Sequence, residues 1–168
     1  MLEKLEGLRA ALESQGYGYG SEQYGICCHA MSYLGLPYLR TEELSGATID
    51  CSTLTSQSYW EGALIGIPFI AEGQRLANSA SMIEDVINAV PGDVFVRYES
   101  VQHSPDKMYN HVGLFLGRDS QGNGWVIEAR GGQGVILTPA DDFPPHGGIR
   151  RFIIAKTKQF CVWSSNTR

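Results

Sequence analysis

One cysteine stands where a helix is predicted to begin, in the stretch ATIDCSTLTSQSYW at residues 47–60. Asp50 suits the N-cap of that helix, so Cys51 falls in its first turn, ahead of Ser52 and Thr53. A thiol attacks carbonyl carbon as its thiolate, and the unpaired N–H groups and the dipole of a helix N-terminus favour negative charge. An ordinary cysteine beside a cap would give the same local pattern. A nucleophilic role for Cys51 therefore requires a base within its reach.

Histidine is the usual base for a cysteine nucleophile, and the chain has four histidines. His29 lies in a predicted helix, and core or surface packing explains it. His103 and His146 lie in the polar turn sequences ESVQHSPDK and FPPHGG. His111 differs because it opens HVGLFLG, the most hydrophobic predicted strand. A rigid strand can present an imidazole to a helix tip, so His111 is the predicted base.

The imidazole of a catalytic histidine needs an orienting partner on its other nitrogen. Glu128 lies in the next predicted strand, GWVIEARG, between Ile127 and Ala129. Strand alternation places Glu128 on the face opposite those two residues, where it can point toward His111. A carboxylate inside a strand is costly without a partner, although an exposed face would also accommodate it. Glu128 is the predicted third member of a Cys-His-Glu triad.

The other cysteines, Cys27, Cys28 and Cys161, form neither a disulfide framework nor a zinc-binding spacing. We interpret them as small apolar residues of the interior. The sequence predicts no metal site and no cofactor.

Helices are expected first in the chain and strands later. Leucines at helical spacing predict an amphipathic helix over residues 2–14, and further helices are predicted over residues 26–34, 51–65, 70–78 and 81–90. After Pro91, short β-rich runs alternate with turn sequences: DVFVRY, HVGLFLG, GWVIEAR, GVILTP and IRRFIIA. Helices packed on a mostly antiparallel sheet of about five strands, an α+β domain, are the expected fold.

Composition excludes several classes of protein. The 168 residues suffice for one domain, and a net charge of −5 argues against a nucleic-acid partner. No apolar run approaches the roughly 18 residues of a membrane span. The N-terminus lacks the apolar core of a signal peptide. We expect a cytoplasmic location, or delivery by a phage or a specialised secretion system.

Four motifs in order resemble the NlpC/p60 family of papain-like cysteine peptidases, the bacterial cell-wall peptide hydrolases. They are YLGLPYLRTEELSGATIDCST, VPGDVFV, NHVGLFLG and WVIEARG. The resemblance covers roughly residues 32–155. It implies a papain-like fold and one catalytic domain over residues 1–168, in which residues 1–31 are a helical N-terminal extension.

The resemblance also implies roles for individual residues. Cys51, His111 and Glu128 match the catalytic positions, and Tyr38 matches a tyrosine on the oxyanion side of the site. Asp50 and Ser52 match positions that hold the free amine of the substrate. The implied substrate is a peptidoglycan stem peptide, cut between D-glutamate and diaminopimelate or lysine.

Some features depart from the family pattern and leave alternatives open. LRTEE follows Pro-Tyr where the family has Trp-Gly-Gly, and Thr53 replaces the usual glycine after Asp-Cys-Ser. Glu128 stands where the family commonly has a histidine. In this position the chain resembles the CHAP amidases, which cut near the sugar–peptide junction. Lipid acyltransferases of a related fold use similar chemistry, and a non-enzymatic binding module is the least favoured alternative. Oligomeric state is not predicted.

Overall fold

The computed structural model describes residues 2–38, 49–101 and 104–152. Four α-helices are found there: α1 (Leu2–Ser14), α2 (Glu22–Ser32), α3 (Cys51–Ala63) and α4 (Ala71–Leu76). The amphipathic pattern of α1 places Leu8, Ala11 and Leu12 in the core. No helix in the described ranges is long and apolar enough to span a membrane.

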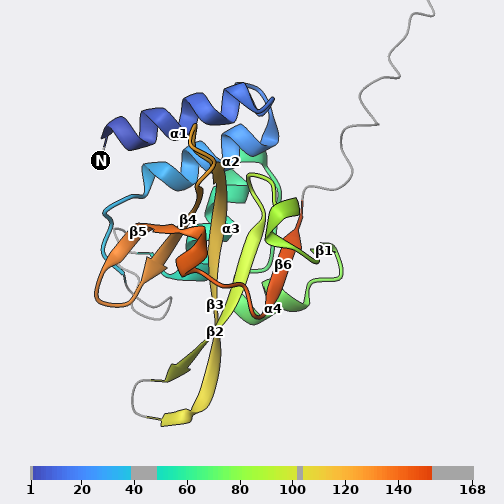
Figure 1. Ribbon diagram of the computed structural model, residues 1–168. Helices are drawn as coiled ribbons and strands as arrows, with labels where there is room; N and C mark the ends of the chain where they lie inside the picture. The colour runs from blue at the N-terminus through green and yellow to red at the C-terminus, as the bar shows by residue number, and fades with distance from the viewer. Residues whose placement is uncertain (1, 39–48, 102–103, 153–168) are drawn as a thin grey trace, which may run out of the picture.

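The strands form one antiparallel sheet in the order β1-β6-β2-β3-β4-β5 (Figure 1). Two short 3-10 helices, η2 (Val86–Asn88) and η3 (Ala140–Asp142), lie in the connections. The strands are β1 (Ser81–Ile83), β2 (Val94–Val101), β3 (Ser104–Arg118), β4 (Gly124–Arg130), β5 (Gly134–Pro139) and β6 (Gly148–Arg151). The expected α+β class is therefore confirmed, with six strands in place of about five.

The additional strand arises where the prediction was wrong. Residues 81–90 were expected to be helical, but Ser81–Ile83 pair with β6 and residues 86–88 form a 3-10 turn. The Asp85 carboxylate accepts a hydrogen bond from the Ile87 N–H, which favours a turn over a continuing helix. Strand β3 also starts earlier than predicted, because residues 104–110 extend the pairing with β2.

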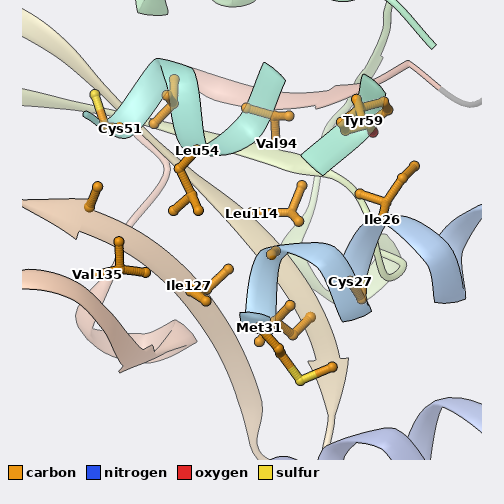
Figure 2. Close-up of a cluster of buried hydrophobic side chains, with 14 of the residues drawn as sticks. Ile26, Cys27, Met31, Cys51, Leu54, Tyr59, Val94, Leu114, Ile127 and Val135 are labelled. Atoms are coloured by element: carbon orange, nitrogen blue, oxygen red, sulfur yellow. The ribbon is translucent and has the colours of Figure 1, made fainter. Parts of the chain in front are cut away.

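The two faces of the sheet pack differently, as the period of a strand requires. The first face contacts the helices, and Figure 2 shows side chains of α2 and α3 meeting those of β3 and β4. On the opposite face, the rings of Phe95 and Phe115 stack at 5.1 Å beside Phe143. The buried strand residues on the helix side are Val94, Val96, Val112, Leu114, Leu116, Ile127, Ala129 and Val135.

The β2–β3 hairpin extends past the rest of the sheet (Figure 1). In the described residues, β6 pairs with β2 only at residues 94–96, and β4 pairs with β3 only from Leu114 to Arg118. Residues 97–101 and 104–113 therefore form a two-stranded arm, whose strands are paired with each other. The arm begins where Arg97 lies directly opposite His111.

Candidate active site

Cys51 is the first residue of α3, as predicted. Asp50 is the N-cap, and its carboxylate accepts a hydrogen bond from the Thr53 N–H at 2.7 Å. The hydroxyls of Thr55 and Ser58 donate to carbonyls within the helix, at 2.9 and 2.6 Å. These internal hydrogen bonds let α3 bury polar residues that form helices poorly. The helix thereby holds the Cys51 thiol at its N-terminal tip, with 8% of the residue exposed.

His111 lies between Cys51 and Glu128. In the described sheet, the pairing of β3 with β4 begins at Leu114, which lies opposite Ile127. His111 precedes Leu114 in β3, so it lies where the two strands have already separated. At this separation the His111 Nε2 contacts the Glu128 Oε2 at 2.6 Å, and the imidazole also hydrogen-bonds with the Cys51 thiol. The contact with Glu128 occupies Nε2, which leaves Nδ1 as the nitrogen for the thiol.

The surroundings of His111 favour its protonated form. Burial lowers the pKa of the imidazole, but hydrogen bonds to Cys51 and Glu128, with the charges of Cys51 and Glu99, raise that pKa to about 9. Since this value lies above neutrality, His111 is an imidazolium at pH 7.

Glu128 is fully buried, yet its surroundings favour the carboxylate form. Burial raises the pKa of the carboxyl, but hydrogen bonds from His111 and Thr138, followed by the charges of His111 and Arg97, lower it below its usual range. The hydroxyl of Thr138 donates to the second carboxylate oxygen. Glu128 is thus a buried carboxylate with partners on both oxygens.

Tyr38, Asp50 and Ser52 all lie near the start of α3. Tyr38 forms an isolated parallel bridge with Ile49, two residues before Cys51 in the chain. The Ser52 hydroxyl donates to the Asp50 carboxylate at 3.1 Å, and both residues are buried. These contacts hold the helix start together. Roles of the three residues toward a substrate stay predictions.

Besides Thr138 and Phe143, which contact the site, sequence reasoning missed Arg97, Glu99 and Tyr109. The Arg97 guanidinium donates to Glu99 through Nε at 2.7 Å and lies 3.4 Å from Glu128 Oε2. The Tyr109 hydroxyl donates to the other oxygen of Glu99 at 2.6 Å. Alternation in VFVRYES places Arg97 and Glu99 on one face, but only the register of β2 against β3 shows that this face includes His111.

The ring of Phe143 packs against the same cluster of side chains. The Arg97 guanidinium lies 4.4 Å from the centre of the Phe143 ring, and the His111 and Phe143 ring centres are 5.7 Å apart. The aromatic ring contacts both cations and limits their movement.

The remaining candidates lie elsewhere or outside the described residues. Cys27 is buried and Cys28 half-buried, and burial raises the pKa of both thiols. His29 contacts Glu61 at 3.4 Å, and His146 lies in an exposed turn. Cys161 and His103 are outside the described ranges. Among the described residues, no group of three or more His, Cys, Asp or Glu side chains could hold a metal ion.

The structure is similar to solved NlpC/p60 structures. NlpC1 from Trichomonas vaginalis has a TM-score of 0.63 and 26% identity over 80% of this chain and 45% of its own. The NlpC/p60 domain of the peptidoglycan hydrolase SagA has a TM-score of 0.56 and 25% identity over 77% and 97%. RipD from Mycobacterium tuberculosis, described as a non-catalytic NlpC/p60 domain protein adapted to peptidoglycan binding, has a TM-score of 0.55 and 17% identity over 81% and 100%.

The present chain spans less than half the length of NlpC1. No protein-family model and no curated protein matches the sequence.

Helices packed on this antiparallel sheet, with a cysteine at a helix tip beside a histidine, define a papain-like α+β domain. The fold is that of the NlpC/p60 domains to which it is similar.

Proposed function

We propose that this protein is a cysteine peptidase that hydrolyses amide bonds of peptidoglycan stem peptides with Cys51, His111 and Glu128. The observation that supports the proposal most is the contact of one imidazole with both a helix-tip thiol and a buried carboxylate. The likeness to the domain of SagA, a peptidoglycan hydrolase, supports the substrate class. The bond between D-glutamate and diaminopimelate or lysine is the proposed target.

The proposed reaction is acyl transfer through the thiol. The Cys51 thiolate attacks the amide carbonyl carbon and forms a C–S bond, while the carbonyl oxygen becomes an oxyanion. His111 then protonates the leaving nitrogen as the C–N bond breaks, which leaves a thioester on Cys51. Water attacks the thioester and passes a proton to His111. The acid product departs, and the thiolate–imidazolium pair is restored.

Glu128 maintains the protonated state that this reaction requires. Its carboxylate bonds to Nε2, which orients the ring so that Nδ1 faces the thiol. The charge of Glu128 stabilises the imidazolium, which is the form that would pair with a Cys51 thiolate.

The start of α3 supplies the proposed oxyanion site. The first N–H groups of a helix have no intrahelical partner, so the Cys51 N–H can donate to the oxyanion. Tyr38, which bridges to Ile49 beside the helix start, is the proposed second donor. One donor in such a site contributes roughly 3 kcal/mol to catalysis. Asp50 and Ser52 are proposed to bind the free amine of the stem peptide.

A second candidate is an amidase that cuts at the sugar–peptide junction. The observation that favours it is Glu128, because a carboxylate in the third position is a feature of the CHAP enzymes that this chain resembles. The chemistry at Cys51 would be the same, and only the position of the cleaved bond would differ.

Product mapping tests the proposal. Purified peptidoglycan and free stem peptides are incubated with the protein, and the products are identified by mass spectrometry. New amino termini on diaminopimelate or lysine are expected. A free L-alanine terminus beside intact muramic acid would establish the amidase instead. Binding to the wall without any new product would contradict both the peptidase and the amidase. That result would indicate a binding module, which is how RipD is described.

A further inference from the structure

Two carboxylates and two cations form a compact network on one face of the sheet. The Glu128 Oε2 is within reach of both the His111 Nε2, at 2.6 Å, and the Arg97 Nη2, at 3.4 Å. Glu99 accepts from Arg97 and from the Tyr109 hydroxyl. Arg97 is 7% exposed, so its charge is held mainly by these neighbours and not by water.

We propose that Arg97 and Glu99 form a charge-balanced pair that sets the ionisation of His111 for the proposed reaction: Arg97 lies beside Glu128 and opposite His111, and Glu99 offsets the guanidinium charge. The proposal rests on the proposed function. Neither residue contacts the reacting atoms, so their effect passes through Glu128 and His111.

The geometry explains why both members are needed. Arg97 pairs directly across the strands with His111, which brings two cations close together. An unpaired guanidinium there would disfavour the imidazolium, while Glu99 alone would add a second, half-buried negative charge. Arg97 also contacts the Glu128 carboxylate at 3.4 Å, and its pairing with Glu99 leaves little net charge beside the imidazole.

Groups from several elements enter the charge balance of the His111 imidazole. They are Cys51 from α3, Glu128 from β4 and Glu99 from β2, with Arg97 of β2 directly opposite His111. Tyr109 of β3 acts through Glu99, to which it donates, and the uncharged ring of Phe143 packs against the imidazole. Of these, Arg97 and Glu99 are opposite charges in direct contact. Replacing Arg97 should therefore shift the midpoint of the His111 titration in the opposite direction from replacing Glu99.

The test is an NMR titration of the His111 imidazole in full-length protein carrying Cys51→Ala, which removes the coupled titration of the thiol. Glu99→Gln is expected to lower the His111 midpoint by about 0.5 to 1 pH unit, because a negative neighbour is lost. Arg97→Gln should raise it by about as much, because a positive neighbour is lost. The double variant should return to within about 0.3 unit of the parent.

Glu72→Gln is the matched control, since Glu72 is an exposed carboxylate that also contacts an arginine, Arg75, on α4. It should leave the midpoint unchanged. If both single variants leave the midpoint unchanged, or move it in the same direction, the pair only packs against Phe143 and the proposal is overturned. If Arg97→Gln does not fold, Glu99→Gln is sufficient to test the proposal, because an unshifted His111 midpoint in that variant would contradict it. No hydrolysis is measured, so failure of the proposed function would leave this result intact.

Discussion

At the scale of single residues, the site depends on the charge of one imidazole. His111 is 3% exposed, and an isolated imidazolium in that position would be unfavourable. Hydrogen bonds to Cys51 and to Glu128, the latter at 2.6 Å, reverse this preference and raise the pKa of His111 to about 9. Removing the charge of Glu128 is therefore the sharpest single change that keeps the shape of the site.

Glu128→Gln should lower kcat by on the order of 10²-fold, since the imidazole loses its charged partner. The alkaline limb of the pH–rate profile follows loss of the imidazolium, whose pKa falls when the negative neighbour is removed, so this limb should move to lower pH. KM should change little, because Glu128 is buried behind His111. Steady-state kinetics from pH 5 to 10 would check this, with Glu72→Gln as the control. An unchanged profile would mean that another group orients His111.

The residues of the proposed triad could be singled out individually from the sequence, and their neighbours could not. Cys51 was predictable because Asp50 marks the helix start, and Glu128 because strand alternation leaves a carboxylate that needs a partner. Arg97 and Glu99 read as residues of an ordinary half-exposed strand. Their place in the site depends on the pairing of Arg97 with His111, which is a property of strand register and not of local sequence.

At the scale of elements, α2 and α3 must pack closely for Cys51 to reach its position. The helices meet at Gly25 and Gly62, where an added Cβ on Gly25 would lie 2.1 Å from the Gly62 carbonyl oxygen. That atom belongs to the backbone and cannot move away without shifting a helix. The contact therefore requires glycine on both sides.

Gly25→Ala should destabilise the protein by about 3 kcal/mol through overpacking of this contact. Gly7→Ala in α1 is the matched control, because Gly7 is exposed and an added Cβ there has no atom within 4 Å. In that position alanine should stabilise the helix by about 0.5 to 1 kcal/mol. Urea unfolding of both variants measures the difference. Equal effects would show that the helices do not pack as described.

Helices and strands were predicted correctly where the sequence has one clear hydrophobic pattern. The prediction failed where a helical pattern and turn residues occur in the same segment. Strand β4 at residues 124–130 and β5 at 134–139 match the predicted runs, since each is bounded by glycine or proline. Residues 81–90 have both apolar spacing and turn residues, and pairing with β6 decided their conformation. That partner lies far along the chain, so a local pattern could not reveal it.

At the scale of the whole molecule, the site links stability to pH. His111 has a folded pKa of about 9, above the unfolded value of about 6.5, so its stabilising contribution is fully present below pH 6.5 and is lost as pH rises through 9. Glu128 acts with the opposite sign. Its lowered pKa gives a contribution present above the unfolded pKa near 4.5 that is lost as pH falls through the folded value.

The free energy of unfolding should therefore fall between pH 6.5 and 9.5, by as much as about 3 kcal/mol from His111. Burial also raises the pKa of Cys27, and this contributes a loss of the same sign at alkaline pH. The comparison with His111→Gln isolates the histidine, because that variant keeps Cys27. Chemical unfolding at several pH values gives both curves. Parallel curves for the two proteins would contradict the assigned ionisation of His111.

A matched pair of thiol variants tests whether Cys51 is the nucleophile. Cys51→Ala and Cys28→Ala each remove one sulfur, but Cys28 is half-buried in α2, away from His111. The measurement is the rate at which stem peptides are hydrolysed by each folded variant. We predict that Cys51→Ala abolishes hydrolysis while its stability stays within about 1 kcal/mol of the parent, and that Cys28→Ala retains the parental rate. Full activity in Cys51→Ala would contradict the account.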